Sequence, residues 1–234
     1  MEVQAVNKIY TRFGVDKIDA NGVRIEGQRY DLKKTDDFYY AFVGLDLLDL
    51  KNFVLDMEKN IQNQKDELKE KDCYAFDPFF SEDYNQAYRI GTRYYFLLRN
   101  SVFISIYSLL EDSLNNICKH YKRNYSNQPY NSNSKGFYIN EAKRFIESQM
   151  GGAFLEEEWH LLNQYRLIRN KIVHNKGIVS NSGQVISAIH RLNGTGISLQ
   201  DQRIIELDNT ACINFIELIE KVLFSLCKSF AFLD

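Results

Sequence analysis

The residues best suited to chemistry lie in one short stretch near the end of a helical segment. Arg169, Asn170 and His174 belong to the sequence Arg-Asn-Lys-Ile-Val-His, and Gly177 follows shortly after it. A guanidinium is a permanent cation whose planar donors fit phosphoryl oxygens, and an imidazole gives or takes a proton near neutral pH. Together these two groups could cleave RNA without a metal ion.

The spacing of this motif is uncommon. An Arg-Asn pair with a His five positions after the Arg is expected from the composition only about 0.02 times in a chain of this length. Two further Arg-Asn pairs, Arg99-Asn100 and Arg123-Asn124, have no His at that distance. The motif therefore favours a functional site. The alternative is that its cations only interact with the last helix carbonyls and with acidic neighbours.

Further cations accompany the motif. Arg166, Lys171 and Lys176 lie in the segment 163–177, which contains no acidic residue, whereas Glu156-Glu157-Glu158 stand just before it. Two explanations stay open. The segment could bind the phosphates of RNA, or its charges could follow helix polarity, since acids favour the first turn of a helix and bases the last.

A straight helix cannot bring all the motif side chains to one face. Five residues turn through roughly 140° beyond a full turn, so Arg169 and His174 point in different directions. Asn170 and His174 are four residues apart and share a face, so the amide could orient the imidazole, with Arg166 extending the row. A two-fold dimer that places both motifs beside one groove would bring the guanidinium and the imidazole together.

The elements that must hold the motif are helices. The chain is 44% apolar with only two Pro, and apolar residues recur every three or four positions, which predicts a mainly α bundle of four to five helices. Gly177 is expected to cap the motif helix. We expect helices over 36–71, 82–123, 140–150, 156–176 and from about residue 209 to 230.

Two short segments are expected to be β structure. Asn21-Gly22 between alternating residues predicts a hairpin within an N-terminal β appendage, residues 1–35. Alternation over 178–207, around Asn193-Gly194-Thr195-Gly196, predicts a hairpin or irregular insertion before the last helix. Residues 36–234 are expected to form a single globular helical domain, because a chain of this size can bury one large core.

Composition limits the setting in which the protein works. The net charge is −2, so the whole molecule does not attract nucleic acid and any attraction must be local. Cys73, Cys118, Cys212 and Cys227 form no CxxC pair, which predicts neither a metal site nor a disulfide framework. We expect no cofactor, no signal peptide and no membrane span, and therefore a cytoplasmic protein.

The helices and the motif together resemble the HEPN superfamily, with Arg169, Asn170 and His174 on its three motif positions. The resemblance covers roughly residues 36–232. It implies a metal-independent endoribonuclease that acts as a dimer, often as a toxin with an antitoxin partner or as an antiviral defence effector. Other members have lost activity and bind RNA or proteins, so an inactive HEPN-like module remains the alternative. A helical interaction protein that carries the motif by accident is a third.

The resemblance also bears on two further residues. Glu111, on the second expected helix, is similar to an acidic residue of several branches, although it could instead pair with a buried Arg. Lys176 stands where one toxin branch has a Tyr that a partner nucleotidyltransferase modifies, so that pairing is not expected here.

The chemistry expected from the motif is attack of a ribose 2′-hydroxyl on the adjacent phosphate. His174 would act as general acid or base, and Arg169 would stabilise the charge that develops on the phosphoryl oxygens. The products would be a 2′,3′-cyclic phosphate and a 5′-hydroxyl, and DNA would not be a substrate.

Overall fold

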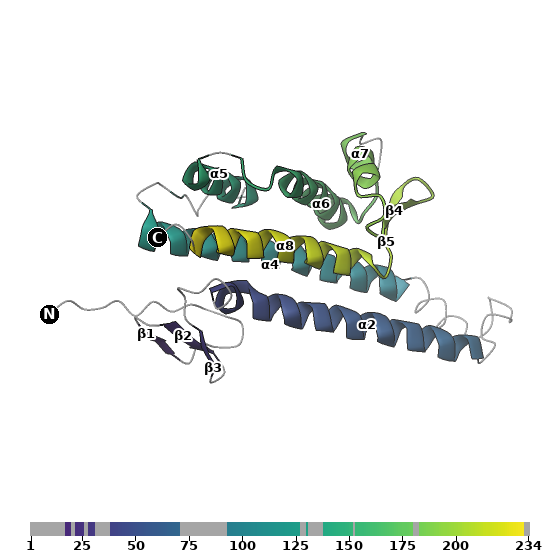
Figure 1. Cartoon of the computed structure of the whole chain (residues 1–234). Coiled ribbons are helices and arrows are strands. Elements are labelled where there is room, and N and C mark those ends of the chain that lie inside the picture. The colour runs from purple at the N-terminus through teal and green to yellow at the C-terminus, as the bar shows by residue number, and fades with distance from the viewer. Residues whose placement is uncertain are drawn as a thin grey trace. The chain divides into compact units, whose positions relative to one another are not determined.

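The described part of the chain is mainly helical, as the sequence predicted (Figure 1). The computed structural model describes residues 17–19, 22–25, 28–30, 38–70, 93–126, 130, 138–151, 153–179 and 183–231. The helices are η1 (Tyr40–Gly44, a π-helical turn), α2 (Leu45–Glu70), α4 (Tyr95–Tyr125), α5 (Tyr138–Met150), α6 (Glu156–Asn175), α7 (Gly183–Arg191) and α8 (Ala211–Ala231).

Most helix ends lie where local sequence places them. Gly151, in the left-handed region at φ 70°, follows the last residue of α5, as the sequence predicted. At the start of α8, Oδ1 of Asp208 accepts hydrogen bonds from the backbone amides of Thr210 and Ala211. A side-chain acceptor of this kind satisfies amides that have no partner within the helix. The 82–92 part of the expected second helix lies outside the described residues.

The segment before α8 differs from the prediction. Residues 183–191 form α7, with Val185, Ala188 and Ile189 buried, so the described residues contain six α-helices where four or five were expected. The spacing of these three side chains is helical, but α7 is too short for its period to stand out beside the alternation that follows. Its hydrophobic face, rather than its length, explains why it forms.

A β-hairpin does follow α7, but its turn is not where the sequence suggested. Strands β4 (Ile197–Gln200) and β5 (Ile204–Leu207) pair antiparallel, with Gln200 opposite Ile204. The turn therefore lies at Asp201–Arg203, whereas Asn193–Gly196 leads from α7 into β4. Gly196 is needed there, because a Cβ at this position would clash with Asp208 and Thr210.

The predicted N-terminal hairpin is confirmed and has a third strand, but Gly22 lies in a strand, opposite Asp19, and not in the turn. Strand β1 (Lys17–Asp19) pairs antiparallel with β2 (Gly22–Ile25), and β2 pairs antiparallel with β3 (Gln28–Tyr30). The order of the sheet is β1-β2-β3. The third strand is too short to show the alternation by which a strand is predicted.

The chain divides into two compact units built from separated segments. The first comprises residues 1–49, 109–159 and 217–234, and the second comprises residues 50–108 and 160–216. Helices α2, α4, α6 and α8 each continue from one unit into the other. The expected boundary after residue 35 and the single domain over 36–234 stay predictions.

Each unit has its own aromatic core. In the first unit, the rings of Tyr121 and Phe230 stack with centroids 3.9 Å apart. In the second unit, Tyr165 of α6 stacks on Phe215 of α8 at 4.1 Å, with Phe103 of α4 packed 5.1 Å from Phe215. Stacked aromatic pairs add to the hydrophobic gain from their burial. Core packing therefore fixes one face of α6 against α4 and α8 within the second unit.

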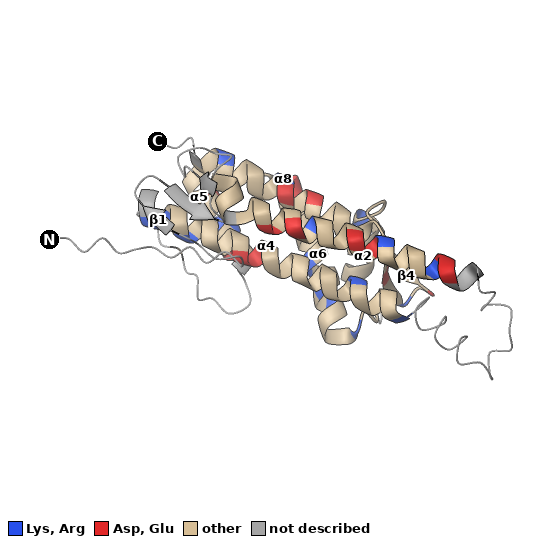
Figure 2. Cartoon of the chain, turned by 90° about the horizontal axis from the view of Figure 1, so that it is seen from below, with Lys and Arg blue, Asp and Glu red and all other residues tan. Residues whose placement is uncertain are grey.

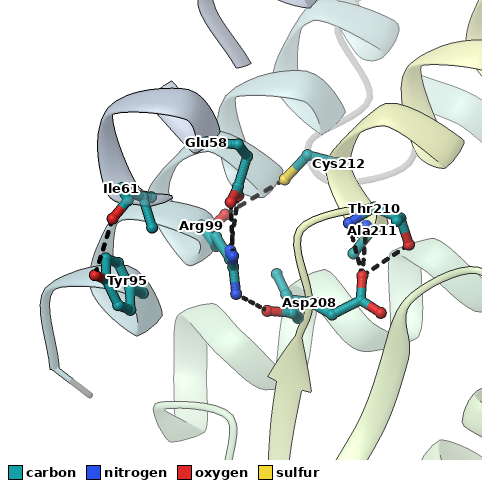
Figure 3. A network of polar contacts seen from close by, with 9 residues as sticks. Glu58, Ile61, Tyr95, Arg99, Asp208, Thr210, Ala211 and Cys212 are labelled. Atoms are coloured by element: carbon teal, nitrogen blue, oxygen red, sulfur yellow. Dashed lines mark hydrogen bonds and ion pairs between the residues drawn. The ribbon is translucent and has the colours of Figure 1, made fainter. Parts of the chain in front are cut away.

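A largely buried ion pair joins three elements of the second unit (Figure 3). Arg99 of α4 donates to both carboxylate oxygens of Glu58 on α2, at 2.7 and 2.6 Å, and to the carbonyl of Leu207 at the end of β5, at 3.1 Å. The two charged side chains are 13% and 15% exposed. Burial raises the pKa of the Cys212 thiol to about 12, and this protonated group donates to the Arg99 carbonyl at 3.8 Å.

No helix within the described ranges is both long enough and apolar enough to cross a membrane.

Removing one member of the buried pair tests its role. We expect Arg99→Met to lower the free energy of unfolding by about 3 kcal/mol or more, because the Glu58 carboxylate would stay buried without its partner. Urea unfolding followed by circular dichroism measures the change. The control is Lys143→Met, which breaks a more exposed pair with Glu147 and should cost less than about 1 kcal/mol. Equal losses in the two variants would contradict a structural role for Arg99.

Candidate functional site

The predicted site lies on the C-terminal half of α6. Tyr165 and Ile168 of this helix are fully buried and Ile172 nearly so. At its other end, Glu158 pairs with Lys221 of α8 at 2.5 Å, and the hydrogen bond from Lys221 lowers the pKa of that carboxyl group. The acids of α6 lie in its first turn and its Lys and Arg residues lie further along the helix; Lys and Arg are coloured blue and Asp and Glu red in Figure 2.

The guanidinium of Arg169 is held by two neighbours. Its central carbon lies 5.4 Å from the centre of the Tyr107 ring on α4, a cation–π contact that contributes on the order of 0.5–2 kcal/mol. Nη1 donates to Oδ1 of Asn170 at 3.1 Å. The Nε atom is buried and makes no hydrogen bond within the described part of the chain. The group is thus positioned while part of its donor capacity stays unused.

No carboxylate among the described residues forms an ion pair with Arg169. Its contacts are an aromatic face and a neutral amide, and neither neutralises the charge. A half-buried cation in such surroundings is stabilised when an anion approaches, because the pair attracts more strongly where water is partly excluded. The position can therefore bind a phosphate.

The expected row of Arg166, Asn170 and His174 does not form. Asn170 turns its amide oxygen to Arg169, while Arg166 donates from Nε and Nη2 to Oδ1 of Asn163, at 3.0 and 2.9 Å. His174 is exposed and makes no hydrogen bond to Asn170 within the described residues. The tautomer of its imidazole is therefore not set by the amide.

The structure brings together Arg169, Asn170 and Tyr107, and it leaves His174 apart from them. Lys171 is half-buried and Lys176 is exposed, both on the last turns of α6 or just beyond. Glu111, on α4, is half-buried and belongs to the other compact unit. Sequence reasoning missed Tyr107. It lies four residues after Phe103 and three before Leu110, a spacing typical of core residues on a helix, and no local signal reveals that its ring lies against Arg169.

The end of α6 is anchored by the hairpin, a feature that the sequence did not reveal. The Gly177 carbonyl accepts a hydrogen bond from the amide of Ile205 at 2.9 Å, and the amide of Val179 donates to the carbonyl of Arg203 at 2.6 Å. Ile178 forms a bridge with Ile204. Residues 177–179, which follow His174 closely, therefore pair with the hairpin along the free edge of β5.

The chain leaves α6 through two successive residues whose backbone is in the left-handed region. Gly177 has φ 76°, as expected for a cap, but the turn begins one residue earlier, at Lys176 with φ 53°. The amide nitrogen of Gly177 donates to the Lys171 carbonyl at 3.1 Å. A lysine at positive φ is uncommon and strained. The strain falls on a candidate phosphate-binding residue two positions after His174.

Among the described residues, no three His, Cys, Asp or Glu side chains are grouped as they would be to hold a metal ion. Comparison of the chain with models of protein families, with curated proteins and with solved structures found no match. The contacts of α6 therefore carry the functional argument.

Two substitutions with opposite expected effects on stability test the strained backbone at the end of α6. Lys176→Gly should raise the free energy of unfolding by up to about 1 kcal/mol, because glycine adopts positive φ without a clash. Gly177→Ala should lower it by about 1 kcal/mol through the backbone alone, since the new Cβ would lie 3.7 Å from its nearest neighbours. Thermal unfolding of both variants measures the shifts. Destabilisation by Lys176→Gly would show that the lysine side chain supports the fold.

Proposed function

We propose that this protein is a HEPN-type, metal-independent endoribonuclease of the cytoplasm that acts as a homodimer. The observation that carries the proposal is the guanidinium of Arg169, which Tyr107 and Asn170 position without any described carboxylate to neutralise it. A preorganised donor of this kind suits the charge that develops on a phosphoryl group in the transition state. RNA supplies that group.

His174 is the proton-transfer residue of the proposed reaction. It takes the proton from the ribose 2′-hydroxyl or gives one to the leaving 5′-oxygen, while Arg169 stabilises the phosphoryl oxygens between them. The exposed imidazole is accessible to a strand bound from solvent. Arg166, Lys171 and Lys176 would hold neighbouring phosphates, and the reaction leaves a 2′,3′-cyclic phosphate and a 5′-hydroxyl.

Dimerisation resolves the separation of the two groups within one chain. Large apolar side chains are exposed around the end of α6, including Val173 (41%) and Leu97 of α4 (60%). Phe96 of α4 lies next to Gly177, so the first turn of α4 and the end of α6 are neighbours. A second copy seated on this surface would bury those side chains and could present its His174 to Arg169.

The proposed biological role is that of a toxin or an antiviral defence effector, controlled by an antitoxin or another protein of a defence system. The alternative is a catalytically inactive HEPN-like module that binds RNA or a protein. The inactive module is favoured by the different positions of the two motif side chains within one chain. Arg169 lies against Tyr107, whereas His174 is exposed.

Cleavage of labelled RNA in EDTA tests the reaction. We expect His174→Ala to lower the rate about 10²- to 10⁴-fold, because it removes general acid or base action. Arg169→Ala should lower it about 10²-fold or more through loss of transition-state stabilisation. The matched controls are His160→Ala, which removes an exposed imidazole from the same helix, and Arg144→Ala on α5. RNA binding without cleavage by the unaltered protein would support the inactive module.

Mixing two inactive variants tests whether the site is shared between chains. If Arg169 of one chain works with His174 of the other, mixed dimers of Arg169→Ala and His174→Ala regain one intact pair. When the two variants are mixed in equal amounts, half of the dimers contain one chain of each. Each mixed dimer has one intact Arg169–His174 pair where the unaltered dimer has two, so activity should return to about a quarter of that of the unaltered protein. No regain after unfolding and refolding the mixture together would mean that each site lies within one chain.

A further inference from the structure

A pocket of about 860 Å³ lies beside the end of α6, in the second compact unit. Ile178 and Val179, which follow His174 by four and five residues, form one wall. Four residues of chain span at most about 14 Å, so the pocket is within reach of a strand bound at His174. The volume falls in the range typical of small-molecule sites, roughly 300–1,000 Å³.

Half of the lining residues of the pocket are aliphatic. They are Ile178, Val179, Ile186 of α7 and Leu199 of β4. Val179 is 4% exposed, whereas Ile186 and Leu199 are half-buried. Aliphatic side chains can pack against a planar ring, and covering them would remove apolar area from water.

The rim of the pocket is polar and carries charges of both signs. His190 of α7 contributes a ring, and the hairpin turn contributes Asp201, Gln202 and Arg203. Because the carboxylate of Asp201 opposes the charge of Arg203, this is a poor site for a phosphate alone. A neutral heterocycle with both donors and acceptors on its edge suits it better, since each rim group can then be satisfied.

The turn presents these side chains at an energetic cost. Asp201 and Gln202 have φ of 49° and 57°, both left-handed. Turns that need two successive residues at positive φ favour Asn and Gly there, because other side chains at positive φ are strained. Non-glycine residues held in such a conformation cluster at functional sites. Neither side chain takes part in the hairpin ladder, whose pairs end at Gln200 and Ile204.

We propose that this pocket, hereafter the base pocket, binds one nucleobase of the RNA strand held at Arg169 and His174, and that it prefers guanine. The inference rests on the proposed function and adds its sequence specificity. Proteins that read RNA sequence commonly take unstacked bases into such pockets, stack them on rings and bond their edges. Guanine alone presents two adjacent donors, N1–H and N2–H, for the Asp201 carboxylate, together with the acceptors O6 and N7 for Arg203.

Binding to a non-cleaving protein tests the base pocket separately from catalysis. His174→Ala protein is titrated with fluorescent uridine-tract oligoribonucleotides that carry a single guanosine, inosine or uridine at the centre, and anisotropy gives Kd. We expect guanosine to bind about tenfold more tightly than uridine. Inosine, which lacks the N2 amino group, should fall between them.

Two substitutions in the base pocket should abolish the preference, each against a matched control. Asp201→Asn removes the carboxylate while keeping a residue that tolerates positive φ, and Arg191→Ala is its charge-changing control on α7, outside the pocket. Ile186→Trp fills the pocket, and Ser187→Trp adds the same ring to the neighbouring exposed position. The preference for guanosine over uridine should drop to about twofold or less in Asp201→Asn and Ile186→Trp. It should persist in the two controls.

Equal affinity for all three oligoribonucleotides, or a guanosine preference that survives both pocket variants, would overturn the proposal. Binding of free guanosine monophosphate, lost in Asp201→Asn, without any affinity for RNA, would also overturn it and make the pocket a free-nucleotide site. Failure of the nuclease would be recognised independently, because the unaltered protein would cleave no RNA while the binding preference of the His174→Ala protein stayed intact.

Discussion

One electrostatic constraint dominates the candidate site, a half-buried guanidinium that the described residues leave without a counter-ion. Arg169 rests on the face of Tyr107 and donates to the neutral amide of Asn170. Compare Arg99, which is also largely buried but has both oxygens of Glu58 and a backbone carbonyl as acceptors. Burying a charge is costly unless it is paired. The charge of Arg99 is paired with Glu58, whereas Arg169 has no carboxylate partner among the described residues and is proposed to gain one from a bound phosphate.

The other consequence of the structure is that the hairpin fixes the end of α6. Pairing of residues 177–179 with β5 holds the backbone directly after His174, and it compensates for the left-handed conformation of Lys176. The same hairpin is held at its far end, where the carbonyl of Leu207 meets Arg99 and the carboxylate of Asp208 begins α8 (Figure 3). Motif, hairpin and proposed base pocket thus share one hydrogen-bonded support within the second unit.

Strain is concentrated in this region. Lys176, Asp201 and Gln202 are three of the four non-glycine residues at positive φ among the described residues, and all three lie at the end of α6 or on the hairpin beside it. Each costs on the order of 1 kcal/mol relative to a relaxed backbone. Glycine would remove that cost at each position but would also remove the side chain. The side chains are retained where phosphate and base contacts are proposed.

The sequence by itself determined the long helices, the N-terminal hairpin and the place of the motif on α6, because helical and strand periods are local properties that a run of residues carries with it. It left α7 and the turn at Asp201–Arg203 unpredicted, since both are short and compete with stronger turn signals at Asn193–Gly196. Only the tertiary structure decided that Tyr107 supports Arg169, that Asn170 turns away from His174, and that β5 anchors the helix end. The first and the last of these contacts join residues far apart in the chain, and packing rather than sequence spacing selects them.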